Sequence, residues 1–516
     1  HRLRQLLAEA QRSRTGSSLT LERLGPEAVE ALVQAAGGRE TPADFAAWLY
    51  RETEGLPLFV VEYLASIAHG GAQSGELALP SSVRDVLRVR LAAASETAAQ
   101  ILATAAVIGR SFDFDTLREA SGRSEEETVA ALEQLIALGL VSEARHGMRE
   151  HEAPGAGPGQ AAPGARFPVL TYDFSHEKLR ALVYEETSLA RRRLLHRRVA
   201  DALLVRAHAR RDQGATAGQI AHHYREAGQD ALAADQFKIA GMHARRLYAN
   251  AEALAHFNAA LALGHPAVAA LHEAIGDLHT LRGEYSAALT SYETAAALCD
   301  PESLPAIESK LGGVHHRRGA WDLAGSHFQA ALLALGEDGH PGERARIYAD
   351  WSLTVHQAGN GDGRAAELAQ RALSLAEAAG DTRALAQSHN ILGVLATSRR
   401  AIDAAVHHLE RSLQLADALG DPSARVAALN NLALAYGASG ATERALELAR
   451  EALALAGALG DRHREAALHN NLADLMHAGG RSDEAMAHLK QAVAIYAEIG
   501  VEAGTVQPEI WKLAEW

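Results

Sequence analysis

Apolar residues recur at three- and four-residue spacing along the C-terminal half of the chain, which predicts a series of amphipathic helices. Residues 423–440 and 442–460 form one such pair, and Gly440 and Gly460 are expected to end the two helices. The pattern repeats every 40 residues, marked by Gly-Asp pairs at 380–381, 420–421 and 460–461. Small residues lie where paired helices must approach closely, at Ala433, Ala445 and Ala452. A fixed interval of this length predicts stacked helical hairpins that bury their apolar faces against their neighbours.

The N-terminal part follows a different pattern. Helices are predicted near residues 1–13, 26–38, 41–53 and 57–69, with a short apolar segment at 18–24. From about residue 79 to 186 the predicted order of helices and short apolar segments is typical of a winged helix, and Ser124 is expected to cap one of its helices. A strand beginning at Leu140 and another within 167–176 would form the wing. Residues 146–165 are rich in Pro, Gly and Ala and are predicted to be a mobile insertion.

The repeat positions resemble the tetratricopeptide repeat (TPR) in a variety of about forty residues. The positions that carry the resemblance are Leu432, Ala433, Tyr436, Gly440, Ala445, Leu448 and Ala452. The same frame recurs upstream at Gly276, Gly283, Ala288, Gly312, Gly319 and Ala324, and downstream at Leu472, Ala473, Gly480 and Ala485. The resemblance implies about six to seven units between residues 216 and 500, wound into an α-α superhelix.

Composition narrows the class of protein. The chain has 516 residues, few aromatics and a formal charge of −14, which favours a mostly α protein and disfavours a general nucleic-acid binder. Cys299 is the only cysteine, so a reducing, cytoplasmic compartment is expected. No apolar stretch is long enough to span a bilayer, and no membrane partner is expected. The first residue is His1 rather than Met, which suggests a fragment of a longer chain.

A second resemblance covers the first 200 residues. The segments that carry it are 55–64 (GLPLFVVEYL), 79–91, 105–117, 135–141 and 172–200. In this order they resemble the lid and winged helix of STAND ATPases, the signal-transduction relatives of AAA+ proteins, including bacterial members that end in TPR arrays. The resemblance implies that nucleotide is bound between a P-loop core, the lid and the winged helix, while the repeats act as sensor.

The P-loop itself is missing. Its G-x-x-x-x-G-K-[ST] motif holds phosphates through backbone amides and a lysine, yet no Gly-Lys pair occurs in the sequence. We therefore expect no enzymatic activity and no cofactor in this chain; ADP or ATP with Mg would bind the full-length parent. The resemblance implies that Pro57 contacts adenine and that His176 meets the β-phosphate of ADP. Each residue also has a simpler interpretation, since Pro57 suits a helix start and His176 a helix cap.

Two further patterns invite functional interpretations. Paired histidines occur at 222–223, 315–316 and 407–408, but adjacent helical residues diverge by about 100° and do not converge on one metal ion. The arginines at 191–193 and 197–198 resemble a DNA contact, with a solvated helix face as the alternative. The corresponding recognition helix, 124–139, is acidic and would repel phosphate. Neither a metal site nor DNA binding is expected.

Asn390, Asn430 and Asn470 occupy equivalent places on the first helix of successive units. An asparagine ladder on the concave face would clamp an extended peptide backbone through donor and acceptor together. The flanking side chains expected to give specificity are Tyr436, His389 and His469. The alternative is that the asparagines bridge neighbouring repeats, as Asn431 and Asn471 would also allow.

These patterns together predict an all-α regulatory fragment in which a winged-helix domain is followed by a TPR superhelix. The expected domains are the end of an NTPase core with lid helices at 1–78, a winged helix at 79–188, a connecting helix at 189–215, a TPR superhelix at 216–500 and a capping segment at 501–516. A protein or peptide ligand would release an ADP-held upstream P-loop core and allow ligand-induced oligomerisation. The alternatives are a free-standing peptide-binding scaffold and a DNA-binding regulator.

Overall fold

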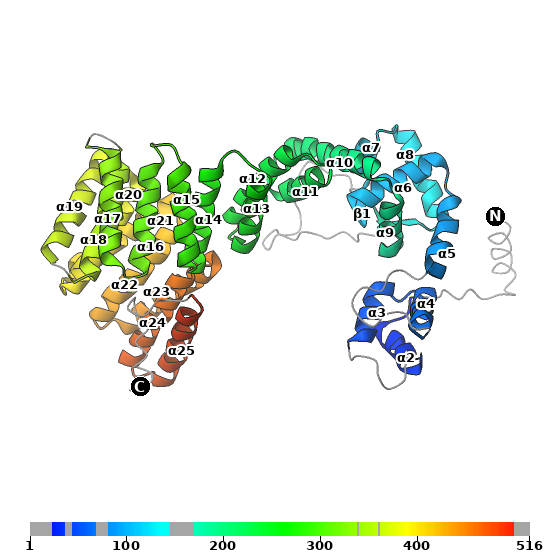
Figure 1. Ribbon diagram of the computed structural model, residues 1–516. Helices are drawn as coiled ribbons and strands as arrows, with labels where there is room; N and C mark the ends of the chain where they lie inside the picture. The colour runs from blue at the N-terminus through cyan, green and yellow to red at the C-terminus, as the bar shows by residue number, and fades with distance from the viewer. Residues whose placement is uncertain are drawn as a thin grey trace, which may run out of the picture. The chain divides into compact units, whose positions relative to one another are not determined.

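The computed structural model describes residues 23–36, 44–68, 81–144, 170–337, 340–359 and 362–499. The expected first helix, the insertion at 146–165 and the capping segment at 501–516 lie outside these residues. Within them the fold is essentially all-α, with 24 helices and three short strands, which confirms the predicted fold class (Figure 1). The chain divides into two compact units. Unit 1 holds residues up to Arg211 together with His222–Gln229, and unit 2 holds Asp212–Ala221 with everything from Asp230 onward.

The described part of unit 1 begins with three short helices that share one small core. They are α2 (Pro26–Ala36), α3 (Phe45–Thr53) and α4 (Pro57–Ala68). Pro26 and Pro57 each occupy the first helical position, where the missing N–H of proline has no cost. The fully buried Tyr63 packs edge-on against Trp48, with ring centroids 6.0 Å apart.

The rest of unit 1 surrounds a three-stranded antiparallel sheet. Its elements are α5 (Ser81–Ala92), α6 (Glu96–Ile108), β1 (Ser111–Asp113), α7 (Phe114–Ser121), α8 (Glu125–Ala137), β2 (Val141–Glu143), β3 (Thr171–Phe174), α9 (Glu177–Glu186) and α10 (Leu189–Arg210). The strand order is β1-β3-β2, with Phe112 opposite Tyr172 and Ser142 opposite Asp173. Ser124 caps α8 in a reciprocal capping box with Glu127, which confirms the predicted cap.

Helix α11 (Gln213–Glu226) spans the division, and seven helical hairpins follow it in unit 2. They pair α12 (Asp230–Arg246) with α13 (Asn250–Ala262), α14 (Val268–Arg282) with α15 (Tyr285–Leu298), α16 (Leu304–Arg317) with α17 (Trp321–Leu335), α18 (Pro341–Gln357) with α19 (Asp362–Ala379), α20 (Thr382–Ser398) with α21 (Ile402–Leu419), α22 (Pro422–Ala438) with α23 (Thr442–Leu459), and α24 (Arg462–Ala478) with α25 (Ser482–Glu498).

The repeated Gly-Asp pairs have a local explanation. Gly420 and Gly460 take positive φ angles of 61° and 69° and end the second helix of a hairpin in the left-handed conformation. Asp421 and Asp461 then accept hydrogen bonds from backbone N–H groups in the first turn of the next helix. Each pair therefore ends one unit and begins the next.

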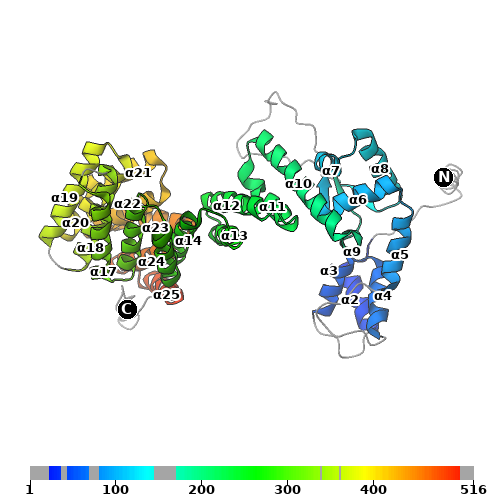
Figure 2. The same ribbon diagram turned by 45° about the horizontal axis from the view of Figure 1, so that its top comes forward.

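The two ends of the hairpin series touch each other. The Nδ2 group of Asn250 donates to the carbonyl of Leu459 at 2.9 Å, and Tyr285 Oη lies 2.7 Å from His463 Nδ1. Arg317 forms two bonds with the Asp461 carboxylate, of 3.1 and 3.3 Å. Figure 2 shows α24 and α25 beside α14. We call these interactions the end-to-end contact, because they join the first three hairpins of unit 2 to its last two.

Candidate ligand-binding groove

The first helices of four successive hairpins line a cavity of about 470 Å³, which we call the groove. These helices are α18, α20, α22 and α24, and neighbouring members of this set pack against each other. Small and apolar residues line it, among them Ala386, Ala427, Ala467 and Leu468. Charged and amide side chains also line it, at Asp350, Arg383, Gln387, Asn390, Asp421, Asn430, Asn431 and Arg464. A cavity with both apolar and a few convergent polar groups is typical of a binding site.

Asp350 contributes a carboxyl group whose pKa is higher than that of an ordinary aspartate. Burial raises its pKa to about 6, although the Gln387 amide and the cations of Arg464 and Arg346 oppose that effect. Gln387 Nε2 donates to Asp350 Oδ1 at 2.5 Å. This carboxyl can therefore act as a hydrogen-bond donor or as an anion within about one pH unit of neutrality.

Arg464 places a positive charge in the same cavity. Its Nη1 atom donates to the carbonyl and the hydroxyl of Ser423, at 2.8 and 2.7 Å. Burial lowers the pKa of Arg464, so its cation would be stabilised by an additional anionic partner. Arg383 and Asp421 also line the groove and pair with each other at 3.1 Å. The groove thus presents both signs of charge to a ligand.

Two of the three asparagines expected to form a ladder, Asn390 and Asn430, bond to the neighbouring asparagines Asn431 and Asn471. Asn431 Nδ2 donates to Asn390 Oδ1 at 3.0 Å, and Asn471 Nδ2 donates to Asn430 Oδ1 at 2.8 Å. Asn430 Nδ2 donates to Asn431 Oδ1 at 3.2 Å. The first two bonds connect neighbouring repeats, which is the alternative that the sequence left open, and the third lies within α22. Asn390 and Asn430 also line the groove, so contact with a ligand there stays a prediction.

The other residues expected beside the groove lie elsewhere. The Nδ1 atoms of His389 and His408 are 2.9 Å apart, and those of His469 and His488 are 2.8 Å apart. Each pair joins the two helices of one hairpin. Tyr436 donates to Glu410 on α21, and the buried Oδ1 atom of Asn470 has no hydrogen-bond partner among the described residues. None of Asn470, Tyr436, His389 and His469 is among the described residues that line the groove.

The polar groove residues missed from the sequence include Asp350, Gln387 and Arg464. Gln387 carried a usable signal, because it precedes Asn390 by three positions and hence shares its helix face. Asp350 belongs to α18, a hairpin whose sequence departs from the regular frame. Arg464 resembles an ordinary charged residue in a first helical turn, and only stacking of the repeats brings it to the groove.

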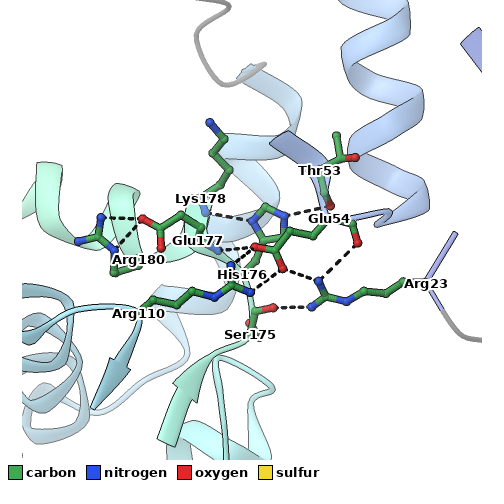
Figure 3. A network of polar contacts seen from close by, with 9 residues as sticks. All are labelled: Arg23, Thr53, Glu54, Arg110, Ser175, His176, Glu177, Lys178 and Arg180. Atoms are coloured by element: carbon green, nitrogen blue, oxygen red, sulfur yellow. Dashed lines mark hydrogen bonds and ion pairs between the residues drawn. The ribbon is translucent and has the colours of Figure 1, made fainter. Parts of the chain in front are cut away.

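His176 lies in a separate polar network in unit 1 (Figure 3). The side chain caps α9, with Nδ1 accepting from the Lys178 backbone N–H at 3.0 Å. Its Nε2–H donates to the carbonyl of Thr53 at 3.0 Å, so both ring nitrogens are engaged. Burial lowers the pKa of His176, which favours the neutral ring. This arrangement matches the helix-cap interpretation, and nucleotide sensing stays a prediction.

Glu54 is the centre of the same network. Its carboxylate accepts from Arg23 at 2.6 Å and from Arg110 at 2.7 Å, and Arg23 also donates to the carbonyl of Ser175 (Figure 3). Burial opposes ionisation, but the two arginines outweigh it and lower the pKa of Glu54. The network joins the end of α3 to the β3–α9 turn. Pro57 is exposed at the start of α4, close to this junction in sequence.

Two other features, a metal-binding cluster and a membrane-spanning helix, are absent from the described part of the chain. No group of three or more His, Cys, Asp or Glu side chains is placed there to hold a metal ion. None of the helices described is both long and apolar enough to cross a lipid bilayer.

Comparison with known proteins identifies part of the repeat array. The tetratricopeptide repeat family model matches residues 424–498, which contain nearly all of α22–α25. No curated protein matches the chain. Among solved structures, a STAND protein with a tetratricopeptide repeat sensor from Pyrococcus horikoshii is 14% identical over 97% of this chain and 72% of its own, with a TM-score of 0.47.

Two Rap structures are also similar to parts of the chain. A Rap protein complexed with Competence and Sporulation Factor is 13% identical over 63% of this chain and 91% of its own, with a TM-score of 0.45. The Rap conjugation gene regulator of plasmid pLS20, in complex with the Phr* peptide, is 14% identical over 55% and 78%, also with a TM-score of 0.45. The family model alone assigns residues 424–498 to tetratricopeptide repeats.

Proposed function

We propose that the hairpin array binds an extended peptide segment of a protein partner in the groove. The observation that carries this proposal is the set of amides and opposite charges that, with small and apolar residues, line one cavity along four first helices. An extended peptide has unpaired backbone N–H and C=O groups. An asparagine or glutamine amide can bond to both, because it carries a donor and an acceptor. Asp350 and Arg464 would select for charged side chains or chain ends of the peptide.

The test uses a random peptide library displayed on phage and selected against the purified chain. Ala427 lines the groove, so Ala427→Arg would fill it, whereas Ala454 is exposed on the second helix α23 and gives the matched control Ala454→Arg. We expect peptides selected on the unmodified chain to bind the control normally and the Ala427→Arg variant at least tenfold more weakly. Equal binding to both variants would exclude the groove as the peptide site.

The wider proposal is that this chain is the regulatory part of a cytoplasmic STAND ATPase. The element order α6–β1–α7–α8–β2–β3 supports a winged-helix domain at 79–188, preceded by lid helices within 1–78. Helix α10 would connect it to the TPR superhelix at 216–500. ADP or ATP with Mg would then bind an upstream P-loop core of the parent, and peptide in the groove would relieve the ADP-held state and permit oligomerisation.

The wider proposal is tested in a parent protein that carries an upstream P-loop core. A selected peptide should accelerate release of fluorescent ADP, and the Ala427→Arg change should abolish that acceleration. Peptide binding without any effect on nucleotide release would support the alternative, a free-standing scaffold. DNA binding is disfavoured because α8 begins with three consecutive acidic residues, at 125–127.

A further inference from the structure

Unit 1 contains a second cavity, which is strongly basic. Its volume is about 570 Å³, and it lies between α6, the α7–α8 turn and the first half of α10. Three arginines line it: Arg123, Arg191 and Arg198. Hydroxyl-bearing side chains of Thr104, Ser121 and Ser188 line it as well, and no acidic residue is among the described residues that do. We call it the arginine cavity.

The charge of this cavity is opposite to that of the chain, which carries 64 acidic and 50 basic residues. Guanidinium groups remain charged at all physiological pH values, so three around one cavity repel each other unless an anion is present. Arg123 is partly compensated by Glu127 at 3.2 Å and by the Gln100 amide. Among the described residues, the Arg198 side chain makes one long hydrogen bond, of 3.4 Å, to the Ser121 carbonyl.

Arg191 has the least compensation of the three. It is exposed, and its side chain makes no hydrogen bond or ion pair with the described residues. By contrast, Arg192 on the same helix stacks on Tyr184 with its guanidinium carbon 4.9 Å from the ring centroid. The fold therefore leaves Arg191 and Arg198 with donors available on the cavity side of α10.

We propose that the arginine cavity binds the phosphoryl group of a small phosphorylated molecule. Planar guanidinium groups bind phosphate oxygens through paired N–H donors, and a dianion matches several arginines better than a single carboxylate does. The cavity is larger than a phosphate ion needs and has the size of small-molecule sites. Ala190, Leu194 and Leu195 give it an apolar wall that would contact the rest of the ligand.

The experiment measures binding to the intact chain by calorimetry at constant ionic strength. The probes are inorganic phosphate, inorganic sulfate, glucose 6-phosphate with glucose, and AMP with adenosine. The test variant is Arg191→Gln with Arg198→Gln. The control is Arg193→Gln with Arg197→Gln, which makes the same change of charge on exposed positions of α10 that do not line the cavity.

We expect saturable binding of at least one phosphate ester and none of its parent alcohol or nucleoside. The test variant should weaken this binding at least tenfold and the control less than twofold, while both keep the circular dichroism spectrum of the parent chain. Affinity should also fall between pH 7.5 and 5.5, because the second ionisation of a phosphate ester has a pKa of about 6.

Three outcomes would overturn the proposal. No saturable binding of any probe would show that the cavity is only a solvated basic surface. Equal weakening in the test and control variants would indicate unspecific charge attraction to α10. A DNA oligonucleotide that binds through Arg191 and Arg198 more tightly than every phosphate ester would assign the site to nucleic acid. If the double variant does not fold, Arg191→Gln alone is measured, since that side chain has no described partner to lose.

Discussion

Replacement of Asp461 by asparagine should weaken the end-to-end contact of unit 2. The side chain of Asp461 is 2% exposed and accepts two bonds from Arg317, which lies 144 positions away in sequence. It also accepts from the backbone N–H of Arg464 at 3.1 Å, as the cap of α24. Asparagine retains the size and the capping oxygen but removes the negative charge. The substitution therefore isolates the charge interaction.

The magnitude follows from the ionisation of Asp461. Burial by itself would raise the pKa, but Arg317 and Arg464 outweigh it and lower the pKa from 3.8 to about 2. Each pKa unit corresponds to about 1.4 kcal/mol, so the folded structure stabilises ionised Asp461 over its protonated form by about 2–3 kcal/mol. Removing one partner of a buried ion pair typically costs about 3–5 kcal/mol, which makes the first figure a lower estimate.

The assay is hydrogen exchange of the intact chain, followed by mass spectrometry of peptides from α14, α16 and α24. A loss of about 2–3 kcal/mol corresponds to a roughly 30- to 150-fold increase in exchange rate where opening of this contact limits exchange. The matched control is Asp421→Asn, at the same Gly-Asp position one repeat earlier, where the ion-pair partner Arg383 is 61% exposed.

The control should change exchange by less than about fivefold, because an exposed ion pair contributes about 0–1 kcal/mol. Equal effects of the two substitutions would refute the reasoning, since they would show that the buried pair contributes no more than a surface pair. Unchanged exchange in α14 and α16 would refute it as well, because their protection would then not depend on α24.

Three further predictions concern the hairpins. Burial lowers the pKa of His389 to about 4, below its unfolded value near 6.5, so the resulting stability is present above about pH 6.5 and is lost as pH falls towards 4. The double variant His389→Leu with His408→Leu introduces the residues that stand one repeat later, Leu429 and Leu448. Its melting temperature should decrease less between pH 7 and pH 5 than that of the parent chain. The same decrease in both proteins would contradict this prediction. Gly393→Ala should destabilise the fold by about 1–3 kcal/mol, because the new methyl group would clash with the Leu409 side chain. Gly457→Ala should be neutral or stabilising, because Gly457 has open space around it. Thermal melts that rank the two variants in the opposite order would exclude tight packing at Gly393. Asn430→Ala should cost about 1–3 kcal/mol because Asn471 loses its acceptor, and a melt equal to that of the parent chain would show that the inter-repeat bond contributes nothing.

The sequence by itself determined the repeating parts of this protein, because their signals are local. Helix ends depend on single residues within one turn, so the Gly-Asp pairs and the Ser124 cap are readable without any knowledge of packing. The 40-residue interval likewise predicts hairpins that stack, and it places Asn390, Asn430 and Asn470 at equivalent positions of successive units. These features depend on residues within one helical turn or on the repeat interval, and both can be read from the sequence.

The tertiary structure decided which of those residues remain available to a ligand. The curvature of a repeat array is the sum of small rotations between repeats, and no local pattern encodes it. This curvature brings Asp350 and Arg464 to one groove and Arg317 to Asp461, across 144 positions of sequence. Packing also turned His389 towards His408 and the ladder amides towards each other, because a partly buried polar group is stabilised by the nearest available partner. A histidine or asparagine is compatible with either role, and only the distances between helices determine which one it has.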